Sequence, residues 1–293
     1  MKTPRARAIV LLAMAYFLPG SAAATEVVAM RVDQAPAIDG NGQDAAWAKA
    51  GSVTVNDAVA NIPLTLKTVY TGDNIYWLVS FPDDAPNREH KTQHWNQDAG
   101  YYVTGPERED TFIFKWALFG TAENLTVSAE RSYQADIWFW KAVRTDPVGY
   151  ADDKLQVYSS NRLPKSKRVL STRGRPFYLT RSGDQGTAAY QVALYPAYEG
   201  DHLPKYTVSE PSGSRADVRA KGQWHNGRWT IEFARKLTTG HVDDVQFETD
   251  KTYTFGVSRF EIAARPINPN IEEPRFGAGE IGELLSLRFQ SGD

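Results

Sequence analysis

The sequence predicts an all-β protein, a two-sheet antiparallel β-sandwich of the immunoglobulin-like type with long loops. Three observations carry this prediction. After the first 24 residues no long apolar stretch follows the helical period. Short segments rich in aromatic and β-branched residues recur instead, and Gly, Pro, Asn and Asp separate them. Many short strands at this spacing are typical of a two-sheet sandwich or a barrel.

The expected strands follow one another along the chain. Residues 64–70 alternate apolar and polar, a turn follows at 72–74, and residues 75–81 form the return strand. Asn226-Gly227 lies between two aromatic segments and is typical of a tight hairpin turn. The other expected strands are 110–119, 125–129, 188–194, 217–224, 229–234, 252–260 and 284–289.

Two stretches are expected to be irregular. Residues 82–109 are mostly polar but contain His90, His94 and Trp95, and residues 161–186 are basic and rich in Ser and Gly. Both exceed the usual loop length of about 12–15 residues. We expect the first to be a functional loop and the second to be a solvated excursion.

Residues 1–24 have the layout of a cleavable secretory signal peptide. Lys2, Arg5 and Arg7 precede an apolar run at 8–18, and residues 1–24 contain no acid. Residues 21–24 offer an A-x-A type cleavage site. The run has 11 residues, whereas about 20 are needed to span a bilayer. No adjacent arginine pair is present, so a Sec-type route to the periplasm is predicted. Residues 25–293 are expected to form one domain.

Composition excludes several functions. The chain has no Cys, which rules out c-type haem attachment, thiolate-held iron–sulfur clusters, Cys-type zinc sites and disulfides. Without residues 1–24 the chain has 30 basic and 35 acidic residues, a formal net charge of −5. We therefore expect no nucleic-acid partner and no polybasic membrane-binding segment. No second hydrophobic segment of membrane-spanning length is present.

No recognisable catalytic motif is present, so the chain is expected not to be an enzyme by itself. The sequence has no G-x-S-x-G, phosphate-binding loop or H-E-x-x-H pattern. Asp152-Asp153 and Asp243-Asp244 are paired acids, but adjacent side chains on a strand point apart. Turn and calcium-like solvated roles are favoured for both pairs over glycosidase chemistry.

Four sequence blocks resemble known families. Ala37-Ile-Asp-Gly40 followed by Asp44-Ala-Ala-Trp47 resembles the start of family-nine carbohydrate-binding modules. Three blocks, at 105–116, 135–153 and 217–257, resemble the ethylbenzene dehydrogenase-related haem-binding domain family. Together the similar blocks extend from about residue 38 to 289.

The resemblance implies a carbohydrate-binding-module-like sandwich that holds one non-covalent haem b and transfers electrons. Its best-known members are the haem subunits of periplasmic molybdenum enzymes. The implied partner is a redox protein, either a c-type cytochrome or a molybdoenzyme with its iron–sulfur subunit.

The resemblance also implies a Met and a Lys as axial haem ligands. Met30 is the only Met after residue 24 and does not lie at the family's position. Lys115 stands where the family has its Met, and Lys251 precedes the strand where the family has its Lys. Strand alternation places Lys115 on the face of Ile113 and opposite Phe114. Each lysine is either an iron ligand or a solvated surface charge.

Other candidate residues surround this set. His94 is the alternative axial ligand, and a surface position is its other reading. Trp138 and Trp140 share one strand face that can line a porphyrin or a sugar, or belong to the core. Trp116 is the neighbour of Lys115, and Arg144 can pair with a haem propionate or with a structural acid.

Two alternatives to the haem protein stay open at this point. One is a haem-free binding module with a carbohydrate-type ligand stacked on Trp138, Trp140 or Trp95 in an open, solvent-reachable site. The other is a structural subunit that docks a redox complex and holds no ligand.

Overall fold

The structure is a computed structural model that describes residues 24–57, 62–119, 124–260, 281 and 283–290. The predicted signal peptide therefore lies outside the described residues, except for its last position. Helical structure in the described part is limited to short 3₁₀ turns, η1 (Ala45–Ala48), η2 (Asp146–Val148) and η3 (Gly213–Ala216). None of the described helices is long and apolar enough to cross a membrane.

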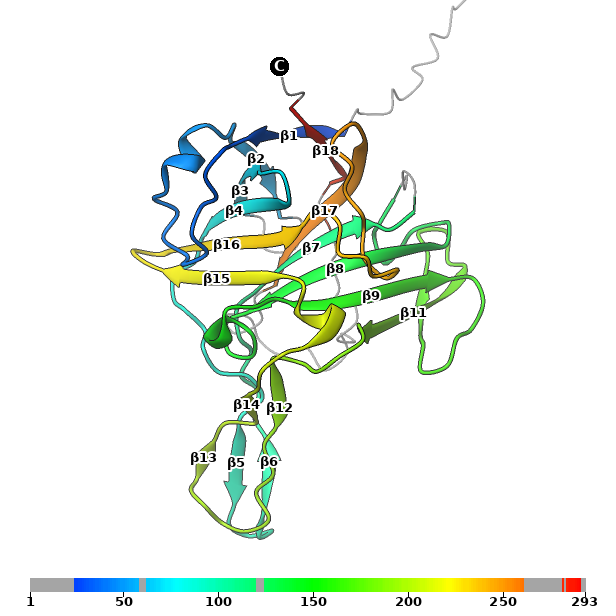
Figure 1. The fold of residues 1–293 in the computed structure, drawn as a ribbon. Helices are drawn as coiled ribbons and strands as arrows, with labels where there is room; N and C mark the ends of the chain where they lie inside the picture. Colours follow the sequence, from blue (N-terminus) through cyan, green and yellow to red (C-terminus); the bar gives the residue numbers. More distant parts are fainter. Residues whose placement is uncertain (1–23, 58–61, 120–123, 261–280, 282, 291–293) are drawn as a thin grey trace, which may run out of the picture.

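Two β layers face each other, as the sequence predicted (Figure 1). In spatial order the first layer contains β10 (Lys167–Leu170), β11 (Pro176–Gly183), β9 (Asp152–Ser159), β8 (Tyr133–Lys141), β7 (Thr111–Ala117), β17 (Thr252–Phe260), β18 (Leu285–Phe289) and β1 (Thr25–Arg31). The second layer contains β3 (Pro63–Tyr70), β4 (Asn74–Pro82), β16 (Arg228–Lys236) and β15 (Arg219–Trp224), with β2 (Val53–Asn56) beside β3.

Strand β1 connects the two layers. Its residues 25–29 pair with β18, and residues 30 and 31 pair with β3. Both pairings are parallel, whereas the other pairings of the two layers are antiparallel among the described residues. The predicted antiparallel sandwich is thus confirmed, with β1 as a parallel exception.

Most predicted strands are present. Strand β17 has the predicted bounds, and the hairpin of β15 and β16 turns at Asn226-Gly227 with φ of 49° and 75°. These positive φ values are the reason for Asn and Gly at this turn. The predicted strand at 125–129 is wrong, because these residues form bends and a turn.

Both predicted irregular stretches contain strands. Residues 161–186 include β10 and β11, which extend the first layer. Phe177 and Leu179 are buried there, and Phe177 stacks on Tyr158 at 4.7 Å between ring centroids. This burial explains why the segment is a sheet edge and not a solvated excursion.

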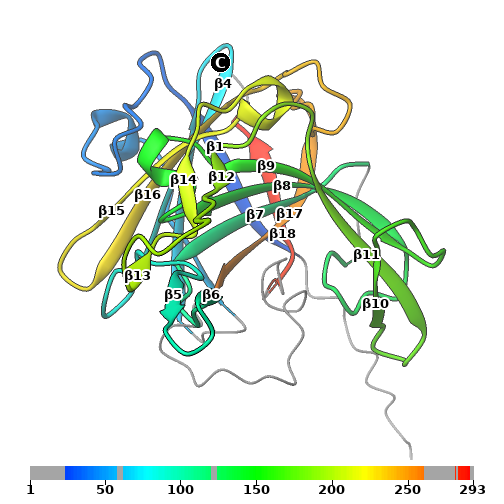
Figure 2. The same ribbon diagram turned by 90° about the horizontal axis from the view of Figure 1, so that it is seen from below.

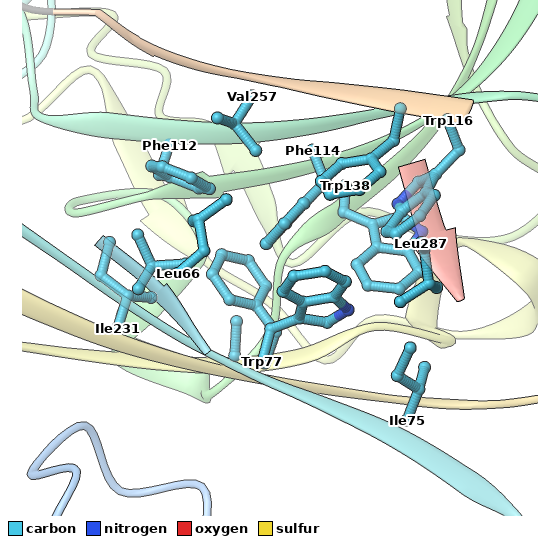
Figure 3. Packing of buried hydrophobic residues seen from close by; sticks show 14 of the residues in the cluster. Leu66, Ile75, Trp77, Phe112, Phe114, Trp116, Trp138, Ile231, Val257 and Leu287 are labelled. Carbon is cyan, nitrogen blue, oxygen red and sulfur yellow. The ribbon is translucent and has the colours of Figure 1, made fainter. Parts of the chain in front are cut away.

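The residues between the layers are mainly aromatic. Figure 3 shows Trp77 of β4 facing Phe114 and Trp116 of β7, with centroid distances of 4.9 and 5.7 Å. Trp138 of β8 lies 5.2 Å from Trp116. All four side chains have no exposed surface. Inward-facing aromatic residues of facing sheets thus form one continuous core.

An arm projects from one end of the sandwich (Figures 1 and 2). We define the arm as β5, β6, β12, β13, β14 and the loops within 87–109 and 187–212. Its strands are β5 (Gln93–Asn96), β6 (Tyr101–Thr104), β12 (Tyr190–Val192), β13 (His202–Leu203) and β14 (Tyr206–Val208). They form a three-stranded and a two-stranded sheet of their own.

Candidate functional site

Lys115 is fully buried on the face of β7 that points away from the aromatic core. Its Nζ donates a hydrogen bond of 2.9 Å to the Tyr133 hydroxyl and lies 5.0 Å from the centroid of that ring. Tyr133 also accepts a hydrogen bond from the Gln156 side chain at 3.0 Å. The strand faces follow the predicted alternation, and Lys115 is a buried amine and not a solvated charge.

Lys251 lies in a different environment. Its side chain is 56% exposed and its Nζ pairs with Glu248 Oε1 at 2.6 Å. The strand partner of Lys115 is Gly256 on β17. Gly256 lies five positions after Lys251, which corresponds to about 17 Å along an extended strand. The structure therefore does not bring the two predicted axial lysines together.

The three predicted site tryptophans belong to the sandwich core. Trp116 and Trp138 are fully buried among other aromatic rings. Trp140 packs edge-on against Trp229 at 4.9 Å, and its Nε1 donates to Asp146 Oδ1 at 2.9 Å. A Cβ at Gly222 would lie 2.6 Å from the Trp140 ring, so glycine leaves the space that this indole occupies. The structure therefore supports the reading of these tryptophans as core residues and not as the wall of a ligand pocket.

Arg144 lies where the arm meets the sandwich. Its Nε pairs with the buried Glu109, and its guanidinium group lies 5.2 Å from the ring centroids of both Tyr190 and Tyr206. Glu109 also accepts hydrogen bonds from the backbone amides of residues 143 and 144. Arg144 thus pairs with a structural acid, the alternative to a haem propionate.

The predicted alternative ligand His94 is part of the arm. Its Nε2 lies 2.8 Å from Glu107 Oε1 and 2.9 Å from the Thr92 hydroxyl. Its ring lies 4.6 Å from that of His202 on the neighbouring strand. This histidine is half-exposed and joins two arm segments, so a surface position describes it better than a buried ligand position.

The haem b that the resemblance implies can be compared with these positions. Lys115 fits a ligand role, because it is a buried amine on the strand where the resemblance expects a ligand. Lys251, Trp116, Trp138, Trp140 and Arg144 do not share a site with it, for the reasons given above. Among the predicted residues, Lys115 is thus the candidate axial donor that remains for the proposal below.

The structure also contains a group of buried acids that the sequence did not indicate. Asp136, Asp153, Asp184 and Asp244 are each at most 7% exposed. Asp153 and Asp244 were expected to be solvated, and this prediction is wrong. The paired acids Asp152 and Asp153 do point apart, because Asp152 bonds Lys141 and Arg215 while Asp153 lies on the core face beside Trp138. No sequence pattern relates Asp136 to residues 153, 184 and 244, which are brought together only by the fold.

The fold is a large two-layer β-sandwich with an arm at one end. A family model described as ethylbenzene dehydrogenase matches residues 26–265, and the chain belongs to that family. This match confirms the resemblance predicted from the blocks at 105–116, 135–153 and 217–257. No curated protein matches the chain.

Three solved structures are similar over nearly the whole chain. A family 9 carbohydrate-binding module from Caldicellulosiruptor kristjanssonii in complex with cellotriose has a TM-score of 0.41 and 12% identity, covering 91% of this chain and 95% of that chain. The same kind of module in complex with glucose has a TM-score of 0.41 and 11% identity, covering 92% and 98%. A putative carbohydrate-binding protein from Bacteroides uniformis has a TM-score of 0.37 and 8% identity, covering 92% and 100%.

Proposed function

We propose that this chain is an exported, non-catalytic subunit of a periplasmic electron-transfer complex and that it binds haem b with Lys115 as an axial donor. The observation that carries the proposal is the complete burial of Lys115 on a strand of the family-matched region. Burial of a lysine in a protein interior is costly, and ligation of a metal ion is one physical reason for it. An amine that has lost its proton can ligate iron, and the hydrogen bond to Tyr133 helps to fix the position of the Lys115 amine.

The role of the protein in this proposal is to bind and orient the cofactor. A bound haem would supply reversible one-electron chemistry, and the axial ligand would set its potential. The chain's own contribution is the fixed position of the Lys115 amine, which the hydrogen bond to Tyr133 and the covered face of β7 restrict. Arg144 is paired with Glu109, so Arg144 is not assigned as a partner of a haem propionate.

An absorption spectrum tests this proposal. Protein exported from haem-replete cells is expected to show a Soret band and, after dithionite reduction, resolved α and β bands. Lys115→Ala is expected to weaken haem binding at least tenfold, and Lys115→Met, which restores the family's ligand type, is expected to keep haem with a changed spectrum. Lys251→Ala, the matched control, is expected to bind haem as the parent does. A featureless spectrum after haem titration would rule the proposal out.

The arm supports a protein as the partner. Nine large hydrophobic residues are exposed in the described part of the chain, and six of them belong to the arm. The six are Tyr101, Val103, Val192, Leu194, Tyr198 and Val208. Concentration of exposed apolar side chains on one projection marks an interaction surface. Four of the six are aliphatic, and aliphatic side chains fit a protein surface better than the aromatic stacking that sugars use.

The carbohydrate alternative has less support at its predicted positions. Trp138 and Trp140 are buried and cannot form an open platform. Trp95 is on the arm and lies 5.0 Å from Tyr102 and 5.2 Å from Tyr198. Its ring is packed edge-on against both neighbours, so only part of this aromatic group faces solvent.

Leu194→Asp tests docking by the arm. Leu194 is 85% exposed, so the variant is expected to fold with an unchanged melting temperature. Its affinity for a c-type cytochrome partner is expected to fall at least tenfold, because a charge is placed in an apolar contact. Val242→Asp is the matched control, since Val242 is 91% exposed and lies outside the arm. Equal affinity of the two variants for the cytochrome would contradict docking through the arm. If the parent protein binds soluble glucans and Trp95→Ala does not, the carbohydrate alternative is favoured.

A further inference from the structure

The buried acids form a group that the proposed electron-transfer role does not use. Asp136 lies on β8 and Asp153 on β9, both on the core face of the first layer. Asp184 follows β11, and its backbone amide donates to the carbonyl of Asp153 at 3.3 Å. Asp244 comes from the segment between β16 and β17. Four separate parts of the chain thus contribute one carboxyl group each.

The carboxylate oxygens of this group converge. One oxygen each of Asp136, Asp153 and Asp244 lies within 4.8 Å of the other two. Oxygen atoms that bind one Ca²⁺ ion at 2.3–2.6 Å are separated by up to about 5 Å. The three oxygens are therefore spaced as ligands of one cation.

Several of these oxygens lack a hydrogen-bond partner although they are buried. They are Asp136 Oδ1, Asp153 Oδ2 and both side-chain oxygens of Asp184 and Asp244. Asp136 and Asp153 have no exposed surface, and Asp244 is 3% exposed. An unpaired buried carboxylate oxygen is costly, and each such group in a folded protein requires an explanation such as an ion.

Two basic side chains lie beside these acids, Arg235 and His241, and His241 Nδ1 lies 3.9 Å from Asp244 Oδ2. Arg235 Nη1 pairs with Asp136 Oδ2 at 2.6 Å, and both side chains are fully buried. The ionised carboxylates of Asp136, Asp153 and Asp244 together with the Arg235 guanidinium carry a formal charge of −2, and Asp184 beside them adds a further negative charge when it is ionised. The group lacks positive charge that a divalent cation would supply.

We infer that Asp136, Asp153 and Asp244 form a structural Ca²⁺ site, with Asp184 beside it. Carboxylate oxygens are hard ligands that favour Ca²⁺ or Mg²⁺ over zinc or copper. Mg²⁺ keeps several of its waters, whereas Ca²⁺ accepts many protein oxygens in flexible geometry, so a buried site fits Ca²⁺ better. The ion would connect β8, β9 and the segment after β16, and would neutralise the group that Arg235 neutralises only in part.

Thermal unfolding of the full mature chain tests this inference. Protein treated with EDTA and dialysed is titrated with CaCl₂, with MgCl₂ in parallel, and calorimetric titration gives the stoichiometry. We expect one Ca²⁺ per chain and a melting temperature raised by several degrees, with a smaller shift in Mg²⁺. No calcium shift in the parent protein would overturn the site and leave protonation as the way in which these acids are accommodated.

Two variants make the test specific. Asp153→Asn is expected to weaken Ca²⁺ binding at least tenfold and yet to raise the melting temperature of the metal-free protein, because it removes one of several repelling charges. Asp146→Asn is the matched control, since Asp146 is buried but bonded to Trp140 and the Gly222 amide. Asp146→Asn is expected to lower the melting temperature of the metal-free and of the calcium-loaded protein alike, so that Ca²⁺ still raises the melting temperature as it does in the parent. A full calcium shift in Asp153→Asn would exclude this group as the site, whatever the haem spectrum shows.

Discussion

Arg235→Ala is expected to lower the free energy of unfolding by about 3–5 kcal/mol, the usual cost of removing one partner of a buried ion pair. Arg235 extends from β16 of the second layer to Asp136 on β8 of the first. Its guanidinium group also donates to the Val245 carbonyl and lies 4.8 Å from the Trp138 centroid. The substitution therefore leaves the buried Asp136 carboxylate with the Val245 amide but without its ion-pair partner, and it leaves a gap beside an indole.

Urea titration followed by tryptophan fluorescence measures this cost. Arg228→Ala on the same strand is the matched control, because Arg228 is exposed and its side chain donates a hydrogen bond to the Ser80 hydroxyl. Its effect is expected to stay within about 0.5 kcal/mol. The double variant Arg235→Met with Asp136→Asn is expected to recover part of the loss, since both charges are then absent. A cost below about 1 kcal/mol for Arg235→Ala would contradict the structural role assigned to the pair.

Trp116→Ala is expected to cost about 3–5 kcal/mol, as large-to-small changes of buried aromatic residues do. Trp116 stacks on Phe255 at 4.5 Å and contacts Trp138 at 5.2 Å and Phe247 at 5.1 Å. The loss combines the transfer free energy of the indole with the cavity that it leaves. Trp116→Phe fills part of that cavity and is expected to cost clearly less.

The same variant separates a core role from a cofactor role. If Trp116 is a core residue, Trp116→Ala lowers stability with or without haem, and denaturant titration of the haem-free protein shows the loss. Trp95→Ala on the arm is the comparison, since Trp95 is only half-buried and lies outside the sandwich. An unchanged midpoint for haem-free Trp116→Ala, with only haem affinity lost, would return Trp116 to the site predicted from the sequence.

Sequence alone was sufficient for the β-sandwich and for the family. Alternation placed Lys115 opposite the Phe114 face, and the Asn226-Gly227 turn followed from its φ requirements. These are local properties, because strand period and turn chemistry depend on neighbours in the chain. The family match over residues 26–265 agrees with the blocks that the sequence offered.

Loop and site predictions were less accurate. Residues 82–109 and 161–186 look polar and irregular, but each contains a strand that is stabilised by a distant partner. Strand β5 pairs with β13, more than a hundred residues away, and Phe177 of β11 is buried against Tyr158. Strand formation here depends on pairing and burial more than on intrinsic preference, so composition underestimates it.

What the sequence by itself determined is the β-sandwich class, the strand face on which Lys115, Trp138 and Trp140 lie and the family to which the chain belongs. Only the tertiary structure decided that Trp116 and Trp138 are core residues, that Lys251 lies apart from Lys115, and that Asp136 meets Asp153 and Asp244. The physical reason is that alternation fixes the direction of a side chain but not what it faces. The group that a side chain faces depends on the order of strands that are distant in sequence, and register and packing between the two layers set this order.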